Sequence, residues 1–225
     1  LSADGLAYYR GIRPDAPDYT DVPVVVLTSP WSASGAEMFA AAARDHGFGI
    51  SVGQRTYGKG VAQLVLDEKN APDLFDGDCL KVTAYRFYSP NGVTNDTMGV
   101  LPTLLISQEN TEAAARLLRA GVPGIADGSL KLELAGHTFY LDDRQARHID
   151  NRAAFTELLE ALPPSARLSV GYSGSTWTET APEELARQWG LEFQGRTFSD
   201  TASSPFAQAI DTLAVYGLIS GYEDG

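Results

Sequence analysis

The sequence predicts an α/β fold, and three observations carry this prediction. Residues 22–27 form a continuous apolar run, which is typical of a strand buried on both faces in a parallel sheet. An alanine-rich, strongly helix-forming segment follows at residues 36–44. A second short apolar run comes next, at residues 49–52. Strand, helix and strand in this order indicate an α/β arrangement.

Further elements are expected on both sides of this unit. Residues 1–20 are polar and rich in Pro, Asp and Tyr, which predicts an irregular entry segment. Residues 61–66 and 80–88 alternate between apolar and polar side chains, as half-buried strands do. Residues 111–119 have the composition of a helix.

A small α+β module is expected after residue 122. Its predicted elements are a hairpin at 130–134 and 138–141, a helix at 152–162, a strand at 166–172 and a helix at 181–190. Asp150 and Asn151 are the candidate caps of the first of these helices. No catalytic pattern occurs in this part, so we interpret it as a connecting module.

The amino-acid composition makes nucleic acid and membranes unfavourable as binding partners. The net charge of −12 disfavours binding to nucleic acid and to anionic lipid, because phosphate groups repel an acidic surface. No apolar run reaches the length of about 18 residues that a membrane span needs. Cys79 is the single cysteine, which excludes an internal disulfide, and its strand-like surroundings predict a buried, inert thiol.

Ser34 is the candidate nucleophile. It lies where the apolar strand gives way to the helix, and catalytic groups collect at the carboxyl ends of such strands. The free N–H groups of the first helical turn can stabilise an oxyanion, and the helix dipole favours negative charge there. The alternative is that Ser32 and Ser34 are only helix caps.

Lys59 is the candidate general base. It lies in a glycine-flanked turn, whereas none of the three histidines occurs in a pattern that suggests pairing with Ser34. A neutral lysine can replace histidine as the base of a serine nucleophile, and burial favours the neutral form. Gln63 follows four residues later and could hold the amine through its side-chain carbonyl. The alternative is a solvated turn lysine.

Residues 53–59 also fit the start of a phosphate-binding P-loop, and we reject that interpretation. The next position needs Ser or Thr to hold magnesium, and it is Gly60. A helix should follow, whereas residues 61–66 alternate like a strand. We therefore expect no nucleotide, metal or other cofactor.

Four linked segments resemble the C-terminal processing peptidases, also called tail-specific proteases. They are VPVVVLTSPWSASGAE, GQRTYGKGVAQL, LKVTAYRFYSPNG and MGVLPT. That family has S-A-S-x-x-E at its nucleophile and T-x-G-K-G-x-x-Q at its base. The interval of 25 residues between Ser34 and Lys59 (59 − 34) is also that of the family. The similarity covers about residues 21–120.

The resemblance implies a role for each matching residue. Ser34 would be the nucleophile, Lys59 the general base, Gln63 the residue that orients Lys59, and the Gly35 N–H an oxyanion donor. It implies a crotonase-like (ClpP/crotonase-type) α/β sandwich and peptide or protein substrates. The family's PDZ domain and its D-L-R-x-N-x-G-G segment are not in this sequence, so we expect a piece of a longer protein whose isolated activity is doubtful.

The last segment resembles the opening of an S-layer homology module. Residues 198–201 fit its F-x-D start, residues 205–210 its amphipathic helix, and residues 217–225 its G-x-I-x-G-x-x-D-G ending. The apolar positions Phe206, Ile210, Leu213 and Leu218 would share one helix face, which also fits a simple core-facing helix. Such modules bind cell-wall polymers, which implies an exported protein on the surface of a Gram-positive-type cell.

The predicted organisation is thus a C-terminal part of a serine peptidase catalytic domain at 1–122, a connecting module at 123–196 and the start of an S-layer homology module at 197–225. Two rival functions remain open. One is a peptide-binding scaffold without turnover, and the other is a cell-wall structural protein in which the terminal module dominates. The complete set of Ser34, Lys59 and Gln63 favours the enzyme.

Overall fold

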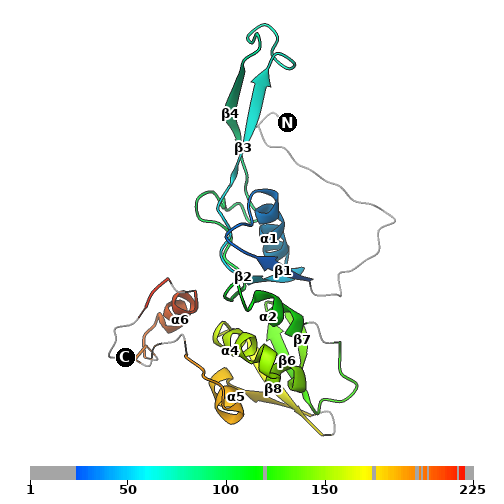
Figure 1. Ribbon diagram of the computed structural model, residues 1–225. Helices are drawn as coiled ribbons and strands as arrows, with labels where there is room; N and C mark the ends of the chain where they lie inside the picture. Colours follow the sequence, from blue (N-terminus) through cyan, green and yellow to red (C-terminus); the bar gives the residue numbers. More distant parts are fainter. Residues whose placement is uncertain are drawn as a thin grey trace.

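The protein has a mixed α/β structure (Figure 1). The computed structural model describes residues 24–118, 121–173, 176–195, 198, 200–201, 203–216 and 218–220. The predicted entry segment at 1–20 and the S-layer-like ending at 221–225 lie outside the described residues.

A small parallel sheet organises the first part of the chain. Strands β1 (Val24–Thr28), β2 (Gly49–Gly53) and β5 (Leu104–Leu105) lie in the order β1-β2-β5. The buried strand is β2, at the centre, whereas β1 lies at the edge with Leu27 exposed, so the prediction of a first strand buried on both faces is wrong. Glycine at the last position of β2 lets the strands meet, because a Cβ on Gly53 would lie 2.1 Å from the Thr28 carbonyl oxygen.

Helix α1 (Gly35–His46) connects β1 to β2 and confirms the predicted strand–helix–strand unit. Its alanines favour helix formation, and Ala40, Ala41 and Ala43 are buried. The helix ends at Gly47, whose φ of 65° is the left-handed conformation that glycine adopts without strain.

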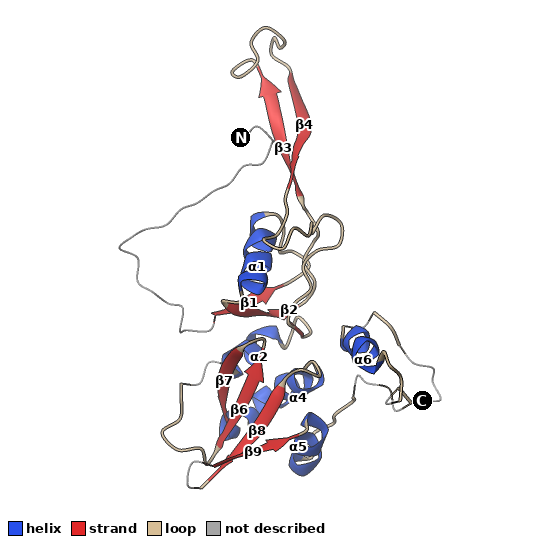
Figure 2. Cartoon of the chain, turned by 180° about the vertical axis from the view of Figure 1, so that it is seen from behind, coloured by secondary structure: helices blue, strands red, loops and turns tan. Residues whose placement is uncertain are grey.

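Strands β3 (Val61–Asp67) and β4 (Cys79–Arg86) form an antiparallel hairpin that projects from the body of the protein (Figures 1 and 2). One face is apolar, because Leu64 lies opposite Val82 and Leu66 opposite Leu80. The sequence predicts half-buried strands and a buried cysteine, but every residue of β4 is exposed, including Cys79. The prediction of a half-buried strand therefore holds for most of β3, whereas it is wrong for β4, and the prediction of a buried cysteine is wrong. The alternation in β4 reflects the two faces of a projecting hairpin rather than contact with a core.

The α+β module has a four-stranded antiparallel sheet in the order β7-β6-β8-β9. Its strands are β6 (Ser129–Leu134), β7 (His137–Asp142), β8 (Arg167–Tyr172) and β9 (Thr176–Thr180). Its helices are α3 (Asp143–Arg147), a 3-10 turn (Ile149–Asn151), α4 (Arg152–Glu160) and α5 (Pro182–Trp189), and α2 (Thr111–Leu117) precedes the module. The predicted hairpin, strand and helices are confirmed, while α3 and β9 are additional.

One apolar core extends through both parts of the chain. Ile50, Val52 and Leu104 of the parallel sheet are in the same buried cluster as Leu132 and Phe155 of the module. Helix α2 lies between the parallel sheet and the module (Figure 1) and adds Ala114 and Leu117 to that cluster. The proposed boundary at residue 122 therefore falls between two parts that share a core.

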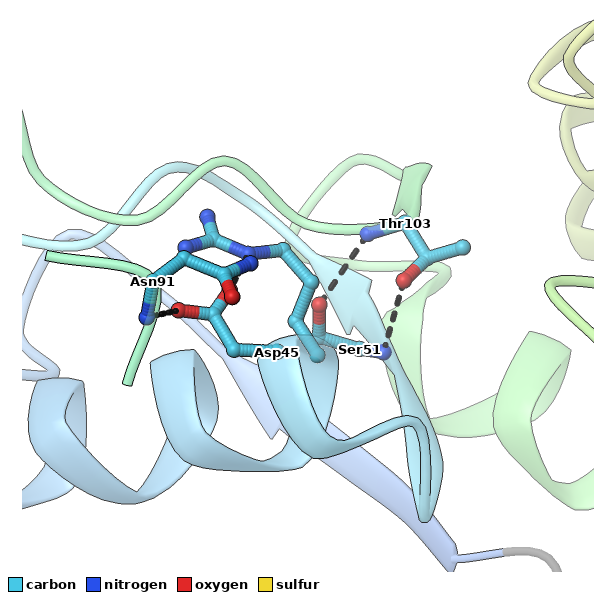
Figure 3. Close-up of polar contacts among 5 residues, drawn as sticks. Asp45, Ser51, Asn91 and Thr103 are labelled. Carbon is cyan, nitrogen blue, oxygen red and sulfur yellow. Dashed lines mark hydrogen bonds and ion pairs between the residues drawn. The ribbon is translucent and has the colours of Figure 1, made fainter. Parts of the chain in front are cut away.

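Polar contacts fix α1 and β2 to the loops around them (Figure 3). Ser51 and Thr103 exchange two hydrogen bonds of 3.1 and 3.0 Å between their backbone N–H groups and side-chain oxygens. The buried Asp45 carboxylate accepts from Arg44 at 2.7 Å and from the Asn91 N–H at 3.1 Å. Burial alone would raise the pKa of Asp45, but these bonds outweigh it and lower the pKa to about 2. The ionised Asp45 carboxylate therefore stabilises the folded protein fully when the pH is above the ordinary pKa of 3.8, and this stabilisation is lost as the pH falls toward 2.

Helix α6 (Ala207–Val215) confirms a helix in the last segment. Ala214 and Val215 are its buried residues, whereas Phe206, Leu213 and Leu218 are exposed. The predicted apolar face of this helix is therefore not the face that packs on the protein. Within the described ranges, none of the helices has the length and apolar character needed to span a bilayer.

Candidate active site

Ser34 lies at the turn between β1 and α1, immediately before the first helical residue. Its φ of 56° and ψ of −113° are an unusual conformation for a residue with a side chain. Such a conformation costs about 1–3 kcal/mol and is most often found at functional sites. Helix capping alone does not need it, because an ordinary N-cap has extended backbone angles.

Glu37 links the Ser34 turn to the Lys59 turn. Its carboxylate is completely buried and accepts four hydrogen bonds. The donors are the Ser34 N–H at 2.9 Å, Thr56 Oγ1 at 2.5 Å, the Gly58 N–H at 2.7 Å and the Lys59 N–H at 2.8 Å. One carboxylate thus fixes the backbone of the candidate nucleophile relative to the backbone of the candidate base.

These four donors determine the charge of Glu37. Burial alone would raise the pKa of its carboxyl, because a charged group loses hydration. The hydrogen bonds from Thr56 and from the three backbone N–H groups outweigh burial and lower the pKa below its ordinary value of 4.5. Glu37 is therefore an anion at neutral pH, with all its partners donating.

The turn that carries Lys59 packs closely on residues 95–100. The Thr97 N–H donates to the Gly58 carbonyl at 2.8 Å, and the Thr56 N–H donates to the Val100 carbonyl at 3.1 Å. A Cβ on Gly60 would lie 2.5 Å from the backbone nitrogen of Asp96, so no larger residue fits there without movement. The glycines around Lys59 are thus explained by this close backbone contact.

The Glu37 carboxylate connects the backbone of Ser34 to the backbone of Lys59, and Gln63 follows on strand β3. Lys59 is half-buried, and its side chain makes no ion pair with any carboxylate in the described part of the chain. Gln63 is half-buried on β3, at a bulge where Ala84 is the extra residue of β4. Among the described residues, no side-chain hydrogen bond joins Ser34, Lys59 and Gln63 to one another, so their roles stay predictions.

Gly35 is the first residue of α1, and its N–H donates to no acceptor among the residues that the structure describes. Gly35 is exposed, and a Cβ built on it would meet nothing within 4 Å, so there is open space beside this residue. An unpaired N–H at a helix start, next to a serine, can donate a hydrogen bond to a developing oxyanion.

Two residues of the candidate site were not among the catalytic candidates predicted from the sequence. Glu37 and Thr56 form the centre of the polar network, and Thr56 Oγ1 also accepts from the Val100 N–H at 2.6 Å. Both residues lie in the sequence motifs around Ser34 and Lys59, and this position was the one feature of the sequence that could have identified them. Glu37 is also the third residue of helix α1, where a glutamate fits a capping box. No group of His, Cys, Asp and Glu in the described ranges is arranged to hold a metal ion.

Comparisons with known proteins bear on the first half of the chain. Residues 6–106 match the model of peptidase family S41. The chloroplastic C-terminal processing peptidase of Tetradesmus obliquus is 38% identical over 87 residues, which are 39% of this chain and 18% of that protein. The carboxy-terminal processing protease CtpB of Bacillus subtilis is 35% identical over 95 residues, which are 42% of this chain and 18% of that protein.

One solved structure, a photosystem II D1 C-terminal processing protease, matches 44% of this chain and 25% of its own, at 34% identity and a TM-score of 0.36. The matched segment spans about a fifth of the length of the curated relatives. The family model and the relatives support peptidase family S41 for this segment, and that family indicates a peptidase.

Proposed function

We propose that this chain carries the catalytic residues of a serine endopeptidase of the C-terminal processing type. Ser34 is the nucleophile, Lys59 the general base, Gln63 the residue that orients Lys59, and the Gly35 N–H an oxyanion donor. The observation that carries the proposal is the Glu37 carboxylate, which binds the backbones of Ser34 and Lys59 at 2.9 and 2.8 Å. The match of residues 6–106 to a peptidase family supports it.

In the proposed reaction, Ser34 Oγ attacks the carbonyl carbon of the substrate peptide bond while Lys59 Nζ accepts its proton. The Gly35 N–H then donates to the oxyanion, and Lys59 returns the proton to the departing amine. Water hydrolyses the acyl-enzyme in a second step by the same groups.

Exposed aromatic side chains beside the site suit a peptide substrate. Trp31 is 83% exposed and Tyr57 is 66% exposed, although both are large and apolar. The Tyr57 N–H donates to the Ser32 carbonyl at 2.9 Å, so these aromatic residues belong to the two turns that carry Ser34 and Lys59. Large apolar side chains left exposed at a site favour contact with another chain.

Labelling with a fluorophosphonate tests the proposal. The intact protein that contains this chain should form a covalent serine adduct, and Ser34→Ala should form none. Ser173→Ala, an exposed substitution after β8, serves as a matched control that keeps the label. Mass spectrometry of the labelled peptide identifies the serine. No adduct in the folded, intact protein would instead favour a peptide-binding scaffold without turnover.

We also propose that the catalytic part belongs to a crotonase-like sandwich and that residues 197–225 begin an S-layer homology module that holds the protein at a Gram-positive-type cell surface. Helix α6 and the motif around it support the second proposal. Sedimentation with purified cell walls should remove the intact protein from solution, and a variant that ends before residue 197 should stay in the supernatant. Equal sedimentation of both would contradict wall binding through this segment.

A further inference from the structure

The loop at residues 95–100, between β4 and β5, brings a second carboxylate to the turn that carries Lys59. Asp96 Oδ1 accepts the Gly60 N–H at 3.2 Å. The Asp96 side chain is 21% exposed, so water has limited access to this acceptor. Two carboxylates, those of Glu37 and Asp96, therefore bind main-chain N–H groups of this turn.

Both peptide groups that flank the Lys59 Cα are held by side chains. In the peptide group that precedes this atom, the Lys59 N–H donates to Glu37 at 2.8 Å. In the peptide group that follows it, the Gly60 N–H donates to Asp96. Because each peptide group is planar, holding both planes restricts φ and ψ of Lys59. The direction in which the Lys59 side chain leaves the backbone is restricted with them.

The loop that carries Asp96 is itself fixed on both sides of this residue. Before it, Thr94 Oγ1 accepts the Asp96 N–H at 3.2 Å. After it, the Thr97 N–H donates to the Gly58 carbonyl at 2.8 Å, and Thr97 has a φ of 65°. A positive φ is costly for a β-branched residue, and it persists where the surrounding contacts determine the conformation. These contacts hold the Asp96 carboxylate in place against the turn.

Asp96 also contacts the base of the β3–β4 hairpin. Its Oδ2 lies 3.6 Å from Nη2 of Arg86, the last residue of β4. The Arg86 side chain is 55% exposed, and ion pairs that are open to solvent contribute little to stability. The hydrogen bond to Gly60, rather than the ion pair with Arg86, is therefore the contact through which Asp96 can act on Lys59.

We propose that Asp96 is a positioning residue for the general base, because it fixes the peptide group that follows Lys59 and so limits where the Lys59 amine can lie relative to Ser34. The inference rests on the proposed peptidase function and adds a residue that acts through Lys59. Proton transfer needs the base within hydrogen-bond reach of the serine, and a small displacement slows it strongly. The role requires an acceptor oxygen at this place and not a negative charge.

Three substitutions of Asp96 in the intact protein test the inference. Asp96→Asn keeps an acceptor oxygen of the same reach and should keep kcat close to that of the wild type. Asp96→Ala removes the acceptor and Asp96→Glu displaces it by one methylene, so each should lower kcat roughly tenfold or more at unchanged KM. Fluorophosphonate labelling counts the active sites, and kcat is expressed per labelled site, so that a loss of folded protein does not change it. Arg86→Ala, which breaks only the ion pair, is the matched control and should keep kcat.

The outcomes separate this role from the peptidase function. In a wild-type protein that labels and cleaves, unchanged kcat in Asp96→Glu and Asp96→Ala overturns the positioning role and leaves the function intact. A loss in Asp96→Asn as large as in Asp96→Ala also overturns it, because an acceptor oxygen would then not suffice. A rise in KM at constant kcat overturns it by placing Asp96 in substrate binding. If Asp96→Ala does not fold, the comparison of Asp96→Asn with Asp96→Glu decides. A wild-type protein that neither labels nor cleaves overturns the function and this role together.

Discussion

Replacement of Lys59 by alanine is expected to reduce kcat/KM of the intact protein by about four orders of magnitude or more. The proposed reaction needs a base for the Ser34 proton, and the carboxylate that contacts Ser34 in the described part of the chain is that of Glu37. Glu37 accepts from the Ser34 backbone, but its oxygens are occupied by four donors. Cleavage of a fluorogenic peptide measures the loss, and circular dichroism shows whether the variant is folded.

Two further lysine variants make this prediction specific. Lys59→Arg keeps a long cationic side chain but cannot act as a base, because guanidinium does not lose its proton near neutral pH. It should be as inactive as Lys59→Ala. Lys69→Ala, which removes an exposed lysine between β3 and β4, should leave turnover unchanged. Turnover retained in Lys59→Ala would exclude the Ser–Lys mechanism.

Glu37→Gln is expected to have the second largest effect, on stability as well as on activity. A carboxamide has the same shape, but its NH2 group would face N–H or O–H donors where the carboxylate now accepts. We expect the free energy of unfolding to fall by about 3 kcal/mol, since a buried charged acceptor with four donors is lost. Displacement of Ser34 and Lys59 should also reduce kcat by about a hundredfold.

The effect of Glu37 on stability should depend on pH. Because folding lowers its pKa, the carboxylate stabilises the protein fully above the ordinary value of 4.5, and the benefit disappears as the pH falls through the folded value. Urea unfolding at pH 7 should therefore separate wild type from Glu37→Gln more than unfolding at pH 3. Glu179→Gln, which breaks an exposed 3.2 Å pair with Arg167, should change stability by no more than about 0.5 kcal/mol. A similar small change for Glu37→Gln would exclude its role in joining the two turns.

Local sequence signals predicted most of the fold, and the exceptions have physical reasons. Helix α1 and strand β2 were predictable because alanine content and an apolar run specify them locally. Strand β5 is two residues long, and its pairing with β2 depends on residues far away in the chain. The exposure of Cys79 was not predictable, because alternation is the same for a hairpin on a core and for one that projects from it.

The sequence was sufficient to predict which residues form the candidate site, but it was not sufficient to predict the contacts that hold them in place. Motif spacing singled out Ser34, Lys59 and Gln63, and it gave no role to Glu37. The importance of Glu37 comes from bonds to Thr56, Gly58 and Lys59, which lie 19 to 22 residues away. The strained backbone of Ser34 was likewise hidden, since serine favours ordinary cap angles at a helix start.

The apolar core that joins the parallel sheet to the α+β module has a consequence for how this protein loses its structure. Phe155 and Leu132 are covered in part by the same cluster that covers Ile50 and Val52, so neither part can open without exposing apolar surface of the other. Elements coupled in this way open together as one cooperative unit. The module therefore limits how often the turns that carry Ser34 and Lys59 become transiently disordered. A cavity made at Phe155 should shorten the lifetime of the proposed active site, although Phe155 contributes no atom to that site.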